Sequence, residues 1–329
     1  MSWIETSVMG RRGVARGAEG ERHRVDEARQ GEYRYVYGPF AEPVLTAKPG
    51  DVLEVETLDA FAGAVKTEAD LPSKVLNFPF VNPQNGPFRI EGAEIGDALA
   101  VRILDIEPRG EQPRGTTALI PGFGGLVATP QTAMLNPDLP EAVKKMEVTR
   151  ESGVKFSDRV TLPWEPFIGT LGVSPYMEAV SSLQPDYWGG NMDLPDVAPG
   201  AIVYFPVLHD GALLHVGDAH ARQGDGELCG VAVEINATVT LQIDLVKGWT
   251  IPGVRLETEE MIMSVGSARP LEDAARIAYR DLIRWLVDEH GYDETEAYFL
   301  CTQAGKVRLG NMVDPKYTMG ASMRKAWIG

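Results

Sequence analysis

The sequence predicts an α+β protein that is mainly β, with its helices gathered late in the chain. From Tyr33 to about residue 265, short apolar runs alternate with turns rich in Pro, Gly and Asp, which is the pattern of consecutive strands. After Ser267 the apolar residues recur at helical spacing instead. The chain has 329 residues, of which 44% are hydrophobic, so it can bury a large core. We therefore expect sandwich-like or barrel-like layers of strands with a C-terminal helical portion.

Several strands are predicted from the turn that precedes them. Gly50, Gly96 and Gly200 each occupy a turn directly before an apolar run, so each turn is expected to lead into a strand. Alternation of apolar and polar residues indicates further strands. The expected strands cover residues 52–57, 98–106, 160–164, 201–207, 231–246 and 257–265.

Two helices are expected after these strands. A long amphipathic helix should begin at Pro270 and end before Gly291, and a shorter one should cover residues 294–302 and end before Gly305. Residues before Tyr33 are rich in Arg, Glu and Gly and have no apolar period, which is typical of a loosely packed segment. The chain is accordingly divided into a flexible N-terminal arm (1–31), a β-rich body that carries the chemistry (32–265) and an α+β portion packed on it (266–329).

Charge and cysteine content narrow the class of protein. The formal net charge is -16 and no Lys/Arg-rich stripe interrupts the acidic sequence, so nucleic acid is not expected as a partner. The start of the chain has no apolar run of signal-peptide length, and no run of about 18 apolar residues occurs anywhere, so no membrane association is expected. Cys229 and Cys301 are too far apart for a redox pair or a thiolate zinc site. These features predict a cytoplasmic protein.

Residues that can carry chemistry are concentrated between Gly189 and Glu234, which include three of the 5 histidines of the chain. Asp218 and His220 are two residues apart, so on an extended strand they face the same side and can reach one metal ion. His215 has odd spacing from both. It would join such a site only if Gly217 introduces a bulge or bend.

A Gly-rich turn follows this strand at residues 223–227. The next apolar run, residues 228–235, could return beside residues 213–220 as a hairpin, which would bring Glu227 back toward His220. A carboxylate beside a metal-bound water can act as a general base and then protonate a leaving amine. Glu227 is therefore the candidate acid/base for hydrolysis of an amide.

Other interpretations of the same residues remain open. An Asp-x-His pair alone is a weak signal, and a structural Ca or Zn ion in a non-catalytic β-sandwich would need the same side chains. The Gly-rich turn lacks the ending of a phosphate-binding loop and no helix pattern follows it. Cys229 beside the turn is better explained as a small buried hydrophobic residue than as a nucleophile, because no Lys stands near it in sequence.

Several motifs occur in one order along the chain. GGNMD (189–193), GDAHARQGDGE (217–227) and GVAVE (230–234) follow one another, and residues 43–61, 86–106 and 166–175 add further segments. Together these motifs resemble the acetamidase/formamidase family over about residues 33–265. The resemblance implies a β-rich fold, hydrolysis of formamide, acetamide or a similar short amide to the acid and ammonia, and a homo-oligomer, with a dimer preferred.

The resemblance also implies roles for individual residues. It points to a divalent metal, with Zn preferred over Ca, and to Glu227 as the catalytic acid/base. The implied metal ligands are Asp218, His220, Asp193, His215 and Asp59, and the implied substrate-binding residues are Asn191 and Gln223.

The chain departs from the family pattern before the strand that begins near Gly86. Many relatives have His-Pro there, whereas this chain has Asn82 and Pro83, so a role of that His is absent or is taken by Asn82. The long segment that leads into this strand could change the shape of the substrate pocket. A relative that acts on a larger amide is therefore kept as an alternative.

Overall fold

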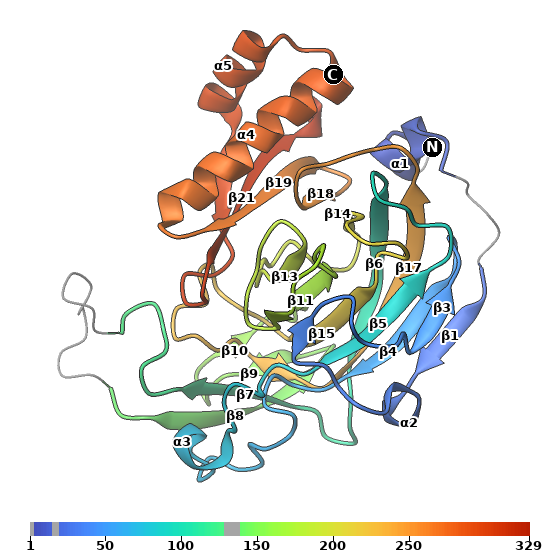
Figure 1. Ribbon diagram of the computed structural model, residues 1–329. Coiled ribbons are helices and arrows are strands. Elements are labelled where there is room, and N and C mark those ends of the chain that lie inside the picture. Colours follow the sequence, from blue (N-terminus) through green and yellow to red (C-terminus); the bar gives the residue numbers. More distant parts are fainter. Residues whose placement is uncertain (1–2, 15–19, 128–138) are drawn as a thin grey trace.

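The computed structural model describes residues 3–14, 20–127 and 139–329. Two large β-sheets pack face to face, and a helical lobe near the C-terminus covers one end of the first sheet (Figure 1). The predicted mainly β fold with late helices is confirmed, and the layers form a sandwich rather than a closed barrel.

The first sheet has nine strands within the described residues, in the order β1-β4-β17-β6-β14-β18-β19-β21-β20. Neighbours pair antiparallel except β1 and β4. Its strands are β1 (Arg22–Val25), β4 (Val52–Thr57), β17 (Ala237–Val246), β6 (Ala98–Pro108), β14 (Ile202–Pro206), β18 (Arg255–Glu257), β19 (Met261–Ala268), β21 (Tyr317–Arg324) and β20 (Lys306–Leu309).

The second sheet runs in the order β10-β9-β8-β7-β16-β15-β11-β13, with β5 also on β15 and β3 on β5. Its strands are β10 (Thr161–Leu162), β9 (Gly153–Lys155), β8 (Ala142–Thr149), β7 (Arg114–Leu119), β16 (Glu234–Ile235), β15 (Leu214–His220), β11 (Phe167–Val173), β13 (Gly189–Asn191), β5 (Gln84–Ile90) and β3 (Leu45–Ala47). A small separate pair consists of β2 (Val36–Tyr37) and β12 (Val180–Ser181).

The main core lies between the two sheets. Val101 of β6 and Val239 of β17 belong to the same buried cluster as Ile168 of β11 and Val216 of β15. Along β17, buried residues alternate with partly exposed ones over the first half of the strand, as expected for a sheet with one face on the core. β11 and β15 are buried along their entire lengths, so polar side chains on them must find partners inside the protein.

The helical lobe consists of α4 (Leu271–His290) and α5 (Glu294–Ala304), which match the two predicted helices. Gly291 adopts a left-handed conformation and ends α4, as the sequence predicted. Trp285 of α4 packs in a second core with Tyr204 and Trp249. Among the described residues, no helix combines the length and hydropathy needed to cross a bilayer.

The prediction of a flexible N-terminal arm is wrong for the described part of residues 1–31. β1 pairs in parallel with β4, and Val25 lies in the main core. Val8, in the short helix α1 (Val8–Arg11), is buried, and its N–H donates to Glu257 at 3.0 Å. Residues 1, 2 and 15–19 of the expected arm lie outside the described residues. The remaining short helices are η1 (Trp3–Glu5), α2 (Glu27–Gln30), α3 (Pro72–Val75) and η2 (Lys325–Trp327).

Candidate active site

His220 is the centre of the candidate site and ends strand β15 in the middle of the second sheet. Its direct neighbours across the sheet are Phe167 of β11 and Glu234 of β16. The ring of Phe167 packs edge-on against the imidazole with centroids 4.8 Å apart, which fixes the plane of the imidazole. The chain does return antiparallel to β15, as predicted, but residues 228–233 form no strand, and only Glu234 and Ile235 of β16 pair with β15.

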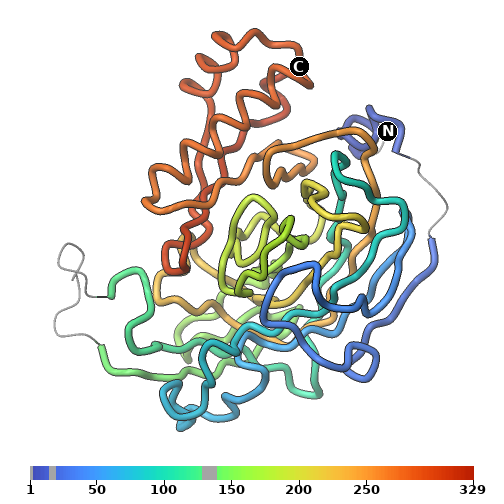
Figure 2. The backbone as a smooth tube through the Cα atoms, viewed as in Figure 1, coloured from blue at the N-terminus to red at the C-terminus, as the bar shows by residue number. Residues whose placement is uncertain are grey.

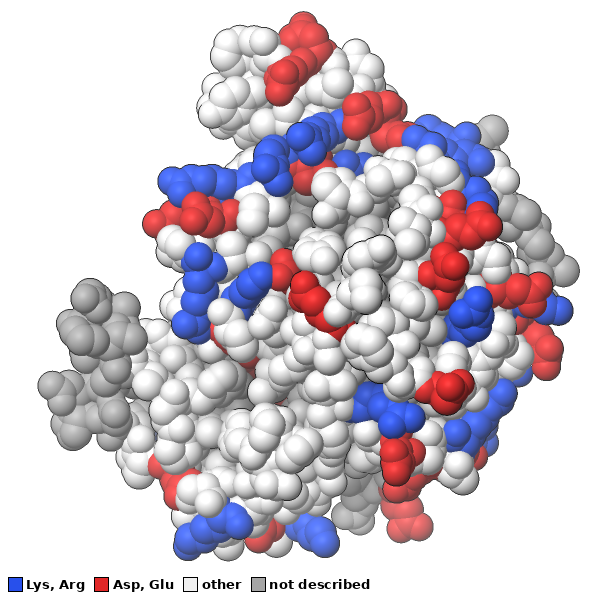
Figure 3. All heavy atoms as spheres, in the orientation of Figure 1, with Lys and Arg blue, Asp and Glu red and all other residues white. Residues whose placement is uncertain are grey.

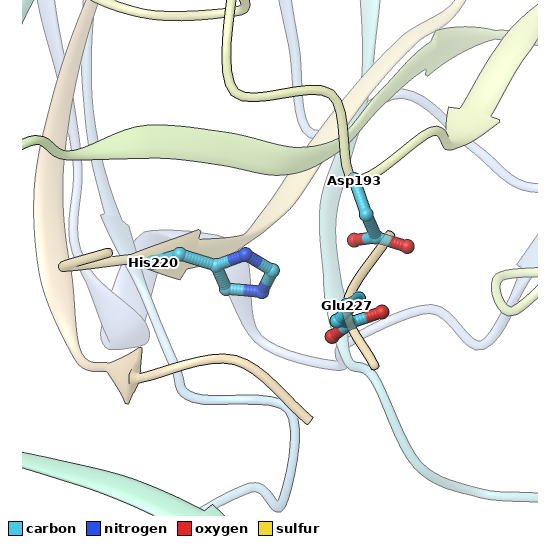
Figure 4. A group of neighbouring side chains, drawn as sticks. All are labelled: Asp193, His220 and Glu227. Carbon is cyan, nitrogen blue, oxygen red and sulfur yellow. The ribbon is translucent and has the colours of Figure 1, made fainter. Parts of the chain in front are cut away.

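Carboxylates converge on this imidazole from several segments. Asp193 and Glu227 form one group with His220, and Asp218 and Glu234 form a second group with the same His220; within each group the potential ligand atoms lie within 4.8 Å of one another. In Figure 4 the ring points toward Asp193 and Glu227, which come from separate loop segments. All five side chains are buried.

Several buried polar atoms of the site lack hydrogen-bond partners. Nε2 of His220 lies 3.3 Å from Oδ1 of Asp218 and 3.2 Å from Oε2 of Glu234. None of these three atoms makes a hydrogen bond, and the same is true of Oδ1 of Asp193. Buried polar atoms are normally satisfied, so this set fits a cation that is coordinated by imidazole nitrogen and carboxylate oxygens. The donor chemistry therefore suits a divalent metal.

The electrostatics of the site lead to the same conclusion. Burial, and then repulsion from Asp314, raises the pKa of Glu227 well above its usual value. Burial, and then Glu227, does the same to the pKa of Asp193, and burial raises the pKa of Glu234 to about 8. Burial alone would lower the pKa of His220, but Glu234 and Asp218 raise it well above its usual value. A cation would offset this repulsion and allow the carboxylates to ionise.

Backbone geometry concentrates here as well. Asp193, Asp218 and Glu227 have φ values of 47°, 59° and 49°, in the left-handed region that residues other than Gly seldom adopt. Such conformations are held by surrounding structure and cluster at functional sites. Gly169 of β11 is needed for a different reason: a Cβ there would lie 2.7 Å from atoms of Asp193, Asp218 and His220. The side chains thus converge on a position that only Gly leaves free.

A second layer of polar groups orients the first. Nδ2 of Asn82 donates to Oγ1 of Thr170 at 2.9 Å and to Oδ1 of Asn191 at 2.7 Å. Oγ1 of Thr170 also donates to Oδ2 of Asp218 at 2.9 Å. Nδ2 of Asn191 donates to Oδ2 of Asp314 at 2.8 Å. Such contacts fix the rotamers of ligand side chains.

Asp314 reaches this layer from the C-terminal portion of the chain. Between β20 and β21 the chain descends from the helical lobe toward the sandwich (Figure 2). Nδ2 of Asn311 donates to the carbonyl of Asn191 at 3.1 Å, and burial raises the pKa of Asp314 to about 7. The site therefore combines residues from the β-rich body and from the segment after residue 266.

The structure brings together five of the residues that the sequence singled out: Asp193, Asp218, His220, Glu227 and Asn191. Gln223 lies beside them, and its Nε2 donates to the carbonyl oxygens of Asp193 and Gly310 at 2.8 and 3.0 Å. Gln223 thus holds the loop of Asp193.

Two predicted metal ligands belong to neither group. Nδ1 of His215 lies 3.0 Å from the carbonyl of Leu213, its ring packs on Tyr37, and burial lowers its pKa to about 4. Asp59 accepts the N–H groups of Phe61 and Gly63, so its carboxylate closes a loop.

Glu234 and Asp314 were absent from the predicted ligand set. The register of β16 on β15 would have identified Glu234, because it places Glu234 directly beside His220. Asp314 lies 94 positions after His220, and no local pattern marks it.

A small chamber opens onto these groups, with a volume of about 60 Å³. One water needs about 10–15 Å³ on this scale, so the chamber suits a molecule of a few heavy atoms. Its polar wall contains Asn82, Asn191, Asp218, Glu227, Glu234 and Asp314, and its apolar wall includes Phe61, Val81 and Phe123.

Comparison with known proteins places the chain in a family. The model of the acetamidase/formamidase family matches residues 20–185 and 177–321. The chain belongs to the acetamidase/formamidase family. The resemblance inferred from the motifs is thus confirmed.

Solved structures agree over almost the whole chain. An acetamidase from Yersinia enterocolitica is 53% identical, with 99% of both chains covered and a TM-score of 0.96. An acetamidase from Bacillus halodurans is 31% identical, with a TM-score of 0.84 over 93% of this chain and 98% of the other.

Sequence comparison also finds similar proteins. A putative formamidase from Schizosaccharomyces pombe is 25% identical over 80% of this chain and 73% of that protein.

Proposed function

We propose that this protein hydrolyses short amides such as formamide and acetamide to the carboxylate and ammonia, with a water activated by a divalent metal. The observation that carries the proposal is the convergence of His220 with four buried carboxylates, three of which (Asp218, Glu227 and Glu234) line a chamber sized for a few heavy atoms. Membership in the acetamidase/formamidase family supports the same reaction class.

In this proposal Asp193, Asp218, His220 and Glu234 hold the metal. Asp218 and Glu234 form one group with His220, Asp193 belongs to the other group with the same imidazole, and each of the four has a buried atom without a hydrogen-bond partner. When bound, a divalent cation lowers the pKa of water and polarises an amide carbonyl. Thr170 and Asn82 orient Asp218 through their hydrogen bonds. The imidazole favours Zn over Ca, because Ca prefers an all-oxygen set of ligands.

Glu227 is assigned the proton transfers. Its carboxylate removes a proton from the attacking water as the new C–O bond forms, and it delivers that proton to the amide nitrogen as the C–N bond breaks. Burial suits this role, because it raises the pKa of Glu227 toward the range where a carboxyl group can both accept and donate a proton. The apolar chamber wall excludes bulk water from the reacting atoms.

The test is release of ammonia from formamide, acetamide and propionamide by the purified protein, before and after chelation and after readdition of Zn. We expect activity that chelation removes and Zn restores. A protein that holds metal and releases no ammonia would instead be the non-catalytic metal-binding alternative. Activity that is unchanged after complete removal of metal would overturn the metal-activated mechanism.

Two further properties belong to the proposal. We expect a homo-oligomer, with a homodimer preferred, which light scattering on the purified protein can measure. We also expect the protein in the cytoplasm. Both cysteines are free, as suits a reducing compartment.

A further inference from the structure

A second, larger cavity adjoins the chamber. This groove has a volume of about 710 Å³, within the range of pockets that hold drug-sized ligands. Ile120, Phe123, Glu227 and Val231 line both the groove and the chamber. The two cavities therefore lie side by side, and the proposed acid/base stands in the wall of both.

The groove wall is largely hydrocarbon. Met146 and Leu162 contribute apolar side chains from β8 and β10. Leu139 and Phe156 also line it, and they are 58% and 42% exposed although both are large and apolar. In the view of Figure 3 the surface over β7 and β8 is mostly uncharged. Apolar side chains exposed together are typical of a binding surface.

The charged residues of the wall other than Glu227 already have partners. Glu141 accepts from Oγ of Ser73 at 2.7 Å. Arg222 pairs with Glu165 at 2.7 Å, and Asp225 pairs with Arg308 at 3.1 Å. A charged substituent would find no free counter-charge on Arg222 or Asp225 and would lose its hydration at a cost, whereas burial of an uncharged hydrocarbon carries no such cost.

We propose that the groove binds an uncharged hydrocarbon part of the substrate, so that an amide with an apolar group of roughly six carbons binds more tightly than acetamide. The inference rests on the proposed amide hydrolysis and extends its substrates from short amides to amides that carry a hydrocarbon group. Burial of such a group against the groove strengthens binding without touching the reacting atoms, so its effect appears mainly in KM.

The experiment compares four amides with the metal-loaded enzyme: acetamide, hexanamide, N-hexylacetamide and 6-aminohexanamide. We expect KM to fall by roughly 10–100-fold from acetamide to hexanamide or N-hexylacetamide. Comparison of hexanamide with N-hexylacetamide shows whether the acyl or the amine side of the substrate enters the groove. The ammonium group of 6-aminohexanamide should cancel this fall in KM. Equal KM values for all four amides, or an equal gain with the ammonium, would overturn the inference.

Variants locate the effect in the groove. Phe156→Ser and Leu139→Ser should raise KM for the hexyl substrate by several-fold and leave acetamide hydrolysis unchanged. Val160→Ser is the matched control, because Val160 is also 42% exposed but does not line the groove. If Val160→Ser has the same effect, the groove assignment fails.

Calorimetry with hexanamide separates this inference from the proposed function. If no amide is hydrolysed but hexanamide binds and Phe156→Ser weakens the binding, hydrolysis fails and the groove assignment stands. If acetamide is hydrolysed but hexanamide binds no better than acetamide, the groove assignment fails alone.

Discussion

Nε2 of His220 lies 3.2 Å from Oε2 of Glu234, and the two residues are direct partners across β15 and β16. The strand register holds both side chains on one side of the sheet. Asp193 and Glu227, by contrast, reach the imidazole from loops through left-handed backbone conformations. The site thus has a rigid half on the sheet and a half that depends on loop geometry, so substitutions in the two halves should differ in effect.

The first prediction concerns Glu227→Gln. The substitution keeps the size of the side chain but removes the basic carboxylate, so kcat for acetamide should fall by roughly 10²–10⁴-fold. Metal content, measured by elemental analysis, should stay the same. Glu165→Gln is the control, because Glu165 pairs with Arg222 at the surface. Near-normal turnover would assign the base to another carboxylate, and loss of metal would make Glu227 a ligand.

The second prediction is that His220→Ala loses metal and activity together, because a ligand is removed rather than a proton carrier. The free energy of unfolding should become insensitive to added Zn, whereas the wild-type protein should be stabilised by it. His209→Ala is the control, because His209 lies in a turn and belongs to neither group. Retention of a full metal equivalent by His220→Ala would exclude His220 as a ligand.

The third prediction concerns Gly169→Ala. The added Cβ would lie 2.7 Å from three side chains of the site, which must then move apart. A displacement of about 1 Å can cost about 10²-fold in rate, so we expect a loss of this order with far-ultraviolet circular dichroism unchanged. Gly224→Ala is the control, since a Cβ there meets no atom within 4 Å. Normal activity of Gly169→Ala would show that the side chains need not converge.

Much of the fold follows from local sequence pattern. Alternation of apolar residues identified β17, and helical spacing identified α4, because each pattern reports directly which face meets the core. The sequence pattern did not predict β1, and the reason is physical. Arg22 and Arg24 are exposed and pair with Glu54 and Glu56 of β4, so only Val25 is fully buried and no apolar period is visible.

The candidate site could be predicted only where its residues are close in sequence. Asp218, His220 and Glu227 lie within ten positions, so a motif reveals them. Asp314 comes from a distant segment and is placed by the chain between β20 and β21. His215 was included through the family resemblance, but its place on the strand directs its Nδ1 to the backbone of Leu213. Tertiary contacts, not residue type, decide which of these residues belong to the site.

The fourth prediction concerns the attachment of the helical lobe. Asp281 of α4 makes a two-pronged ion pair with Arg255 of β18, at 2.9 and 2.7 Å, and both are buried. Asp281→Ala would leave the guanidinium buried and unpaired, which should lower the free energy of unfolding by about 3–5 kcal/mol. Urea denaturation measures this change. Asp273→Ala is the control, because Asp273 pairs with Arg276 at the surface of the same helix. Equal effects of the two substitutions would contradict the prediction.

The last prediction is a pH dependence of stability at Asp244 of β17. Burial raises the pKa of this carboxyl from 3.8 to about 6, against the attraction of Arg102. The folded state holds this proton more tightly than the unfolded state. The contribution of Asp244 to the free energy of unfolding is therefore fully present below about pH 4 and is lost as the pH rises through about 6. Asp244→Asn should therefore gain stability over wild type as the pH rises from 4 to 7, by at most about 3 kcal/mol. Asp70→Asn is the control: hydrogen bonds from Thr67 lower the pKa of Asp70 from 3.8, so this carboxyl is largely ionised in both states and its difference from wild type should change little between pH 4 and 7. Urea denaturation across this pH range measures both, and a constant difference between Asp244→Asn and wild type would contradict the assigned pKa.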